Sequence, residues 1–185
     1  MDQIKFDKSK FDNSWYQPGS ILKRSLWYFV NVFFFINPMF PFRRIKPSIL
    51  KIFGAKIGKN CLIKPGVNIK YPWFLDFGDH VTIGENVWLD NLGLLTIRDQ
   101  VTISQGVVLI NGNHNFKSKS FDLIISEITI EEGAWIGAKS TIAPGVTIGK
   151  YAMISMGSVV FKNCEDFGIY KGNPAQLIKH REFTA

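Results

Sequence analysis

Large aliphatic side chains recur at every sixth residue through the C-terminal half of the chain. Between Ile128 and Val160 they hold one register, at Ile130, Ile136, Ile142, Ile148, Ile154 and Val160. Four residues after each stands a smaller residue: Ala134, Ser140, Val146, Ala152, Ser158 and Cys164. A helix repeats its apolar positions every three or four residues, and a half-buried strand every two. A period of six instead predicts a β-helix, in which each short strand is followed by a corner and a new face.

The same register continues toward the N-terminus in three groups of three. Their members are Ile57, Ile63 and Ile69; Phe77, Ile83 and Leu89; and Ile97, Ile103 and Leu109. Three sixes complete one triangular coil, so the fifteen apolar positions predict five coils. An ordinary β-sandwich is the alternative fold, but periodic matches this long rarely arise by accident.

Three breaks interrupt the register, and all of them fall after the third side of a coil. Two lengthen the spacing to eight residues, between Ile69 and Phe77 and between Leu89 and Ile97; the third inserts a long loop, 110–129, which contains His114. All three segments should therefore bulge from the same edge of the prism. Loops presented by a rigid scaffold commonly carry function.

Residues 1–54 predict a polar, irregular arm followed by an aromatic-rich helical leader. Ser20 is expected to cap the first helix, which Asn37-Pro38 should end, and a second short helix should follow Pro47 and end at Gly54. The first helix is expected to have one apolar stripe, formed by Leu22, Leu26, Phe29, Val30, Phe33 and Phe34.

The leader has two compatible interpretations. It could cap the open N-terminal end of the β-helix, or pack on a neighbouring subunit, because a solenoid end exposes apolar surface. It could also bind a membrane surface through its aromatic residues and the basic residues beside them, Lys23, Arg24, Arg43, Arg44 and Lys46. Its uncharged run is too short to span a bilayer, which requires about 20 residues.

Composition narrows the functional classes. The 185 residues suit one domain, and 46% hydrophobic residues can fill a sizeable core. The net charge of +7 does not indicate nucleic-acid binding, because the basic residues are scattered and no aromatic-basic motif accompanies them. Cys61 and Cys164 occupy small positions of the repeat, so we expect reduced, buried thiols. No signal peptide is recognisable, which favours a cytoplasmic protein, with membrane-peripheral attachment left open.

These features resemble the left-handed β-helix hexapeptide acyltransferases. The resemblance lies in the coils, the looped His114, Trp135 just beyond the loop and the tail Gly172-Asn173-Pro174-Ala175. The segments DNLGLLTI, ISQGVVL and FDLI, with the Phe/Trp/Arg-rich leader, resemble the colanic-acid type among the maltose, galactoside and colanic-acid O-acetyltransferases. The resemblance covers roughly residues 40–182. It implies an all-β fold: a left-handed parallel β-helix over 55–165, a short C-terminal helix within the tail 166–185, and a homotrimer.

The resemblance makes His114 the expected catalytic residue. Acetyl transfer from a thioester to a sugar hydroxyl requires the hydroxyl proton to be removed, and imidazole is a suitable base near neutral pH. Of the other histidines, His80 lies at a coil corner and His180 in the tail. An ordinary histidine of a surface loop is the alternative.

The acceptor is expected to meet the bulge one coil before His114. Asp90 and Asn91 would hydrogen-bond sugar hydroxyls or orient the imidazole, unless they only stabilise the turn. Trp135 would pack beside the catalytic histidine and the cofactor arm, unless it only covers its own coil. Gly84 stands where galactoside-type enzymes carry an asparagine, so the acceptor geometry should differ.

The resemblance also implies acetyl-CoA as the cosubstrate. The backbone N–H of Ala138 would polarise the thioester carbonyl. Met156 and Phe161 would line the pantetheine and adenine, Gly157 would allow close backbone approach, and Lys162 and Lys179 would bind the phosphates, unless these lysines are merely solvated. A family arginine in the tail is Gln176 here.

The sequence thus predicts an O-acetyltransferase that modifies a sugar hydroxyl of a surface-polysaccharide precursor by direct transfer, with no metal. A β-helix carbonic anhydrase would need three histidines on zinc, and the loop has one. Two alternatives remain: an acetyltransferase for a small molecule, such as a xenobiotic or an amino acid, and a non-catalytic β-helix scaffold.

Overall fold

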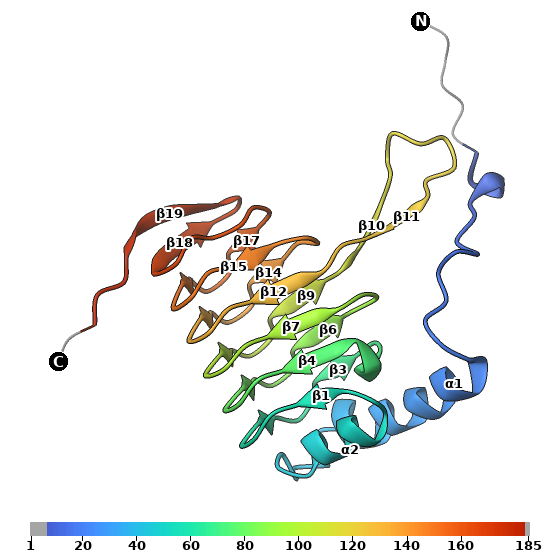
Figure 1. Ribbon diagram of the computed structural model, residues 1–185, viewed down its shortest axis with the longest axis horizontal. Coiled ribbons are helices and arrows are strands. Elements are labelled where there is room, and N and C mark those ends of the chain that lie inside the picture. The colour runs from blue at the N-terminus through green and yellow to red at the C-terminus, as the bar shows by residue number, and fades with distance from the viewer. Residues whose placement is uncertain (1–6, 184–185) are drawn as a thin grey trace, which may run out of the picture.

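Three parallel β-sheets form the faces of a triangular left-handed β-helix, as the computed structural model shows (Figure 1). The structure describes residues 7–183, so residues 1–6 of the predicted arm and 184–185 of the predicted tail lie outside it. Sheet A contains β1 (Lys56–Ile57), β4 (Leu75–Phe77), β7 (Leu95–Ile97), β12 (Ile128–Ile130) and β15 (Thr147–Ile148). Sheet B begins with β2 (Leu62–Ile63), β5 (Thr82–Ile83), β8 (Thr102–Ile103), β13 (Trp135–Ile136) and β16 (Met153–Ile154). Sheet C contains β3 (Asn68–Ile69), β6 (Trp88–Asp90), β9 (Val108–Ile110), β14 (Thr141–Ile142) and β17 (Val159–Val160).

Five complete coils stack in register, as the period of six predicts. All fifteen predicted inward side chains are buried, and successive coils align them, for example Ile57 with Phe77 and Ile97 with Ile130. The smaller residues four positions later are buried as well, and the Ser158 hydroxyl donates to the Ser155 carbonyl at 2.7 Å. Each inward position therefore packs on the equivalent position one coil away, which makes the core continuous along the stack.

Tight corners join the faces, and several use the left-handed backbone conformation. His80 lies at such a corner with φ of 59°, as expected, and Asn60 and Asn86 occupy equivalent places. Gly84 has a different constraint: a Cβ atom there would lie 2.6 Å from the backbone nitrogen of Gln105. A side chain at that position, asparagine included, would require the backbone of residues 103–105 to shift.

The expected C-terminal helix is wrong, because residues 168–180 form a β-hairpin. Its strands are β18 (Gly168–Gly172) and β19 (Ala175–His180), and β18 pairs with β16, aligning Ile169 with Met153. The last complete coil leaves the edge of sheet B unpaired, and a strand satisfies those backbone groups where a helix would not. The Ser155 amide, for example, donates to the Tyr170 carbonyl at 2.8 Å. β18 thus begins a sixth coil.

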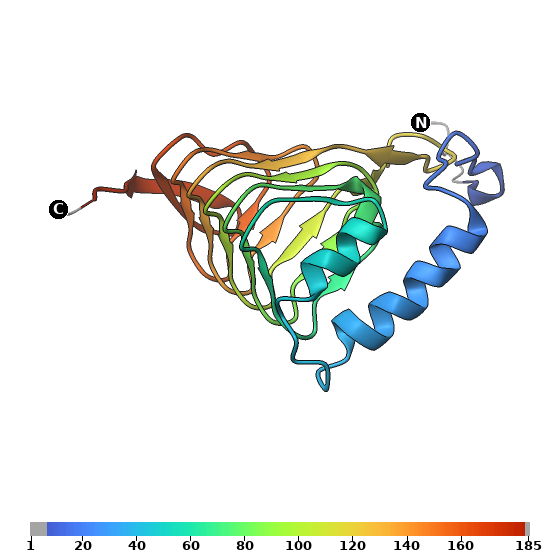
Figure 2. The ribbon, with the colours of Figure 1, turned by 60° about the horizontal axis from the view of Figure 1, so that its bottom comes forward.

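The leader caps the N-terminal end of the stack, which confirms the first of its two interpretations. It comprises α1 (Ile21–Val30), the π-helical turn η2 (Asn31–Ile36) and α2 (Lys46–Ile52); Figure 2 shows α2 over the end of the triangle and α1 beside it. The Ser20 hydroxyl caps α1, as predicted. None of the helices within residues 7–183 is long and apolar enough to cross a membrane.

The buried face of the leader forms hydrogen bonds to groups at the edge of the first coil that have no strand partner. The Trp27 indole donates to the Ile69 carbonyl at 2.9 Å, and the Asn31 side chain bonds both Asn68 and the Ile69 amide. Phe35 packs beside Trp27 with ring centroids 5.3 Å apart. The side of the leader that packs on the coil is thus not the predicted stripe, because edge strands need hydrogen-bond donors and acceptors that aliphatic side chains lack. Five of the six members of the stripe are exposed: Leu22, Leu26, Phe29, Phe33 and Phe34.

Lys46 is an unusual component of this cap, because its side chain is fully buried. The ammonium group donates to the Lys64 carbonyl at 3.2 Å and lies 5.6 Å from the centre of the Phe35 ring. Burial lowers the pKa of Lys46 to about 8, because a low-dielectric environment disfavours its charged form. Lys46 therefore does not belong to the exposed basic residues expected beside the aromatic run.

We predict that Lys46→Met stabilises the protein at pH 7. The pKa of Lys46 is lower in the folded chain than in the unfolded chain, so the unfolded chain binds more protons and wild-type stability rises from pH 7 to pH 9. Methionine removes that dependence, and the gain at pH 7 should be on the order of 1 kcal/mol. Denaturant unfolding at both pH values measures it, with Lys51→Met, on the exposed face of the same helix, as the control. A loss of stability in Lys46→Met at pH 7 would contradict this role of burial.

Candidate functional site

All three register breaks bulge from the edge where sheet C passes into sheet A. The first contains the turn η3 (Pro72–Phe74), the second spans residues 91–94, and the third projects as a hairpin of β10 (Gly112–His114) and β11 (Leu123–Ile125) (Figure 1). The predicted position of the loops is therefore confirmed. Long insertions fit only where a coil corner faces solvent, so the hairpin leaves the core undisturbed.

Two buried asparagines fix these bulges to one another. The Asn91 amide bonds both the amide and the carbonyl of Tyr71, and the Asn111 amide donates to the carbonyls of Leu94 and Ser126. Asn91 was expected to contact the acceptor, but its side chain is completely buried and bonded to backbone. Asn91 therefore stabilises the turn, which was the alternative role given for it. The role of Asn111, the corresponding residue one coil later, was not foreseen.

The hairpin holds His114 in one orientation. Its Nδ1 lies 2.8 Å from the carbonyl oxygen of Phe121, and the two rings stack with centroids 4.3 Å apart and planes 6° apart. A carbonyl only accepts hydrogen bonds, so Nδ1 carries the proton and Nε2 of the neutral ring keeps a free lone pair. Phe121 adopts a φ of 58°, which bulky residues rarely do, and that conformation turns its carbonyl toward His114.

A small network stiffens the turn beyond His114. The hydroxyls of Ser118 and Ser120 both donate to Asp122 at 2.8 Å. These hydrogen bonds lower the pKa of the Asp122 carboxyl, because they stabilise its ionised form. The turn that carries Phe121 is thus held by the hydrogen bond between its carbonyl and His114 and by the bonds from Ser118 and Ser120 to Asp122.

The N-terminal arm forms the second wall of the His114 site, which sequence reasoning did not foresee. The Asp7 amide donates to the Lys119 carbonyl at 3.0 Å, and the Phe11 ring lies 5.9 Å from the His114 ring. A cavity of about 380 Å³ results, lined by Lys8, Phe11, His114 and Phe121. The scattered aromatic residues of the arm were the only signal in the sequence.

The arm then crosses the second bulge near Asp90. The Tyr16 hydroxyl donates to the Leu92 carbonyl at 2.6 Å, and burial chiefly raises the pKa of Tyr16, with contributions from Tyr71 and Asp90. Burial also raises the pKa of Asp90, which is half-buried at the end of β6. Asp90 therefore lies at the predicted bulge, beneath the arm rather than in the cavity at His114.

Trp135 and the six predicted cofactor residues lie in three other places within one chain. Trp135 and Lys179 are on sheet B, where the Trp135 indole donates to the Ser104 hydroxyl at 2.9 Å, while Ala138, Met156 and Gly157 form the corner between sheets B and C. Phe161 and Lys162 follow β17, at the corner between sheets C and A. None of the seven lines the His114 cavity, so a single chain does not bring Trp135 beside the histidine.

Comparison with known proteins identifies the family to which this chain is similar. The family described as "Bacterial transferase hexapeptide (six repeats)" matches residues 127–162. WcaF of Escherichia coli strain K12, named for an acetyltransferase role in colanic acid biosynthesis, is 37% identical over 91% of this chain and 93% of its own length. This chain belongs to the hexapeptide-repeat acetyltransferases.

Two solved structures of the family superpose well. A galactoside acetyltransferase in complex with coenzyme A is 26% identical and has a TM-score of 0.76, covering 86% of this chain and 80% of its own. A hexapeptide-repeat acetyltransferase of Vibrio cholerae O1 biovar eltor, complexed with acetyl coenzyme A, is 20% identical and shares the fold with a TM-score of 0.78, over 88% of each chain. Membership in this family makes the chain an acyltransferase, as the sequence predicted.

We predict that neutral His114 carries its proton on Nδ1. The Phe121 carbonyl accepts that proton, so the other tautomer would leave two acceptors facing each other. Long-range ¹H–¹⁵N correlation of the side chain at about pH 8, where imidazole is neutral, distinguishes the two tautomers. His80→Asn and His180→Gln variants assign the signals. A dominant Nε2–H form in His114 would show that the Phe121 carbonyl does not hold the ring in solution.

Proposed function

We propose that this chain is an acetyl-CoA-dependent O-acetyltransferase that modifies a sugar hydroxyl, with His114 as the general base. One observation supports the proposal most: Nδ1 of His114 is bonded to a carbonyl, so Nε2 can accept a proton at the cavity. The named activities of WcaF and of the galactoside acetyltransferase support the reaction class and the sugar acceptor. The coenzyme A complex of the latter supports the cosubstrate.

In the proposed reaction, Nε2 of His114 takes the hydroxyl proton while the sugar oxygen attacks the thioester carbonyl. The carbonyl oxygen becomes an oxyanion, which the backbone N–H of Ala138 would stabilise. When the tetrahedral intermediate collapses, the carbon–sulfur bond breaks and the imidazolium returns its proton to the departing thiolate. The Phe121 carbonyl, bonded to Nδ1, stabilises the imidazolium between these two steps.

Transfer is proposed to be direct, without an acetylated enzyme. Cys61 and Cys164 are buried, and burial raises the pKa of both, to about 12 for Cys164. A thiol is far less nucleophilic than a thiolate, so neither group suits attack on a thioester.

The cosubstrate would lie along the outer surface of the last two coils. Met156 and Phe161 are exposed and apolar enough to line its arm, and Lys162 and Lys179 are exposed cations for its phosphates. Gly157 adopts a φ of 71°, and a Cβ atom there would meet nothing within 4 Å. Packing therefore does not demand a glycine, whereas close approach of a ligand to the backbone would favour one.

We further propose that the site forms between subunits of a homotrimer. Within one chain neither Trp135 nor the predicted cofactor residues line the His114 cavity, which supports a site that a neighbouring copy completes. Asp90 and the arm would belong to the acceptor side of the histidine-bearing chain. The acceptor would be a surface-polysaccharide precursor, as the colanic-acid role named for WcaF suggests.

We predict that His114→Ala lowers acetyl transfer by about 10²–10⁴-fold while the fold and cosubstrate affinity are kept, because only proton removal is lost. Release of coenzyme A from acetyl-CoA in the presence of oligosaccharide precursors measures the rate. His80→Asn is the matched control, since asparagine already occupies equivalent left-handed corners. A rate in His114→Ala within a few-fold of the wild type would exclude the proposed base.

A further inference from the structure

The outer face of α1 and η2 is apolar and uncovered. Leu22, Leu26, Phe29 and Phe33 are 80%, 56%, 57% and 61% exposed, respectively. They follow one another by four, three and four residues, opposite the side that Trp27 and the other capping residues turn to the sheet edge. A helix that is apolar on both sides normally has both covered. Here the fold of one chain covers only one.

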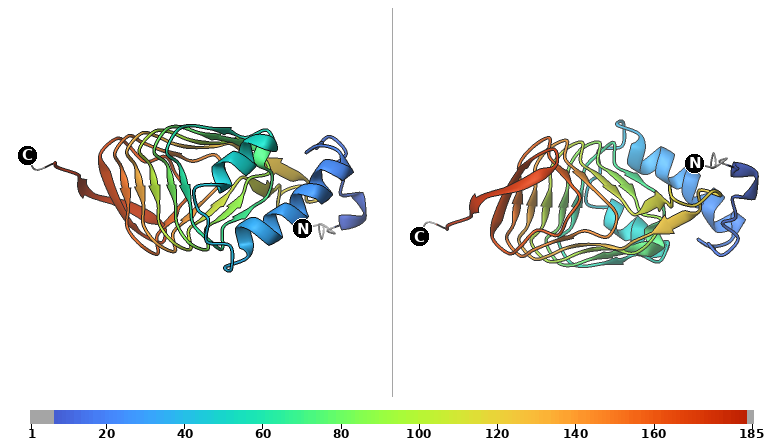
Figure 3. Two further views of the ribbon diagram at one scale, coloured as in Figure 1. Left: turned by 90° about the horizontal axis from the view of Figure 1, so that it is seen from below. Right: turned by 90° about the horizontal axis from the view of Figure 1, so that it is seen from above.

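The apolar surface continues from this helix into the connection to α2. Met39 is 84% exposed, Phe42 63%, Ile45 51% and Ile52 81%. The two helices lie at the same end of the molecule, opposite the β18–β19 hairpin (Figure 3). Large contiguous apolar surfaces of this kind mark sites of interaction.

The charge of the chain is concentrated at the same end. Residues 13–75 contain ten of the 22 basic residues and none of the 15 acidic residues. The next coil, residues 76–94, carries four acidic residues and no basic one. Two of them contact this segment: Asp79 accepts from the Lys59 amide at 2.7 Å, and Glu85 lies 3.9 Å from the Lys64 ammonium. Outside residues 13–75 the remaining acidic residues outnumber the basic ones, so this segment accounts for the whole excess of positive charge.

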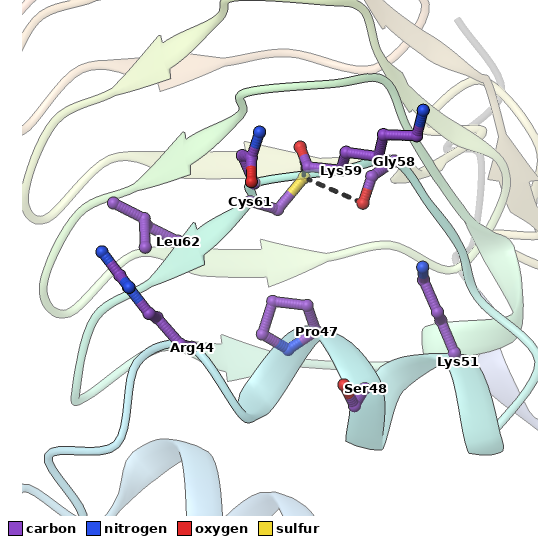
Figure 4. A pocket seen from close by; sticks show the side chains of 9 residues that line it. Arg44, Pro47, Ser48, Lys51, Gly58, Lys59, Cys61 and Leu62 are labelled. Atoms are coloured by element: carbon purple, nitrogen blue, oxygen red, sulfur yellow. Dashed lines mark hydrogen bonds between the residues drawn. The ribbon is translucent and has the colours of Figure 1, made fainter.

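Three of these cations surround a cavity beside α2. Arg44, Lys51 and Lys59 line it together with Ser48, and its volume is about 640 Å³ (Figure 4). Arg44 and Lys51 extend from the leader, and Lys59 from the first corner of the β-helix. Several cations around an open cavity suit a phosphate group.

We propose that the N-terminal end of the β-helix docks on a bilayer of anionic phospholipid. The outer face of α1 and η2 would enter the boundary between headgroups and acyl chains, and Arg44, Lys51 and Lys59 would lie on lipid phosphates. Attachment is to the surface, consistent with helices too short to span the bilayer. This goes beyond the proposed function, because it concerns where the enzyme works rather than what it transfers.

Charge distinguishes the bilayer from a second copy of the chain as the occupant. A symmetric contact through this face would bring together two segments that each hold ten basic residues and no acidic one. Like charges repel in such a contact, whereas an anionic lipid surface complements them. Aromatic and aliphatic residues flanked by Lys and Arg are also the usual composition of interfacial helices.

Co-sedimentation with lipid vesicles tests the proposal on the full chain. Wild type should bind phosphatidylglycerol-containing vesicles at least tenfold more tightly than pure phosphatidylcholine vesicles, and added salt should weaken the binding by screening. The double variant Leu26→Ser/Phe29→Ser should lose at least tenfold in affinity, since both side chains leave an apolar environment. Phe183→Ser, at the opposite end and 59% exposed, is its matched control.

A second pair of variants tests the contribution of the basic residues to vesicle binding. Lys51→Glu should weaken binding several-fold, and Lys150→Glu, an exposed lysine on the last complete coil, should not. Equal binding to both kinds of vesicle, or binding unchanged in both apolar and charge variants, would overturn the proposal. So would a smaller oligomer in Leu26→Ser/Phe29→Ser by light scattering, because that face would then be a subunit contact. Acetyl transfer assayed without vesicles reports on the proposed function separately.

Discussion

Parallel hydrogen bonding between successive coils is the constraint on which the rest of this structure depends. Each coil satisfies the backbone of the one before it, so only the two ends of the stack leave edges unpaired. The chain closes both ends with its own segments. Asn31 and Trp27 bond the first edge, and β18 pairs with the last complete strand of sheet B. The leader and the C-terminal hairpin thus have the same physical purpose, although their sequences have nothing in common.

The same constraint determines where chemistry can be built. Strands and inward corners cannot lengthen without breaking the stack, so all insertions leave from the edge between sheets C and A. Asn91 and Asn111 have the same role at successive coils along that edge. The side-chain amide of each forms hydrogen bonds to backbone groups that lose their strand partners in the bulge. The hairpin begins directly after Asn111 and holds His114 against the Phe121 carbonyl. This contact requires a left-handed backbone conformation at Phe121, which is strained for a bulky residue. A rigid stack therefore supports a strained turn at the proposed catalytic group.

Sequence periodicity was enough to predict the coils, the fifteen inward residues and the edge from which the loops project, because each depends on spacing alone. Periodicity could not predict the structure of segments that lack the six-residue repeat. The tail lacks the repeat, and the pairing of β18 depends on the open edge left by β16, which is a tertiary property. Hydrophobicity alone also did not show which side of α1 is buried: Trp27 and Asn31 bond the edge of the first coil, while the predicted stripe is largely exposed. The arm beside His114 and the burial of Asn91 depend on long-range contacts that one sequence does not show.

In the proposed mechanism, His114 of one chain acts on a cosubstrate held by another chain. Co-assembly of two inactive variants, His114→Ala and Lys162→Glu/Lys179→Glu, tests it directly. In mixed assemblies some sites would pair an intact histidine with an intact cofactor surface, so acetyl transfer should return to a sizeable fraction of the wild-type rate. Mixed assemblies, verified by differential tagging, that remain as inactive as their parents would mean that each site lies within a single chain.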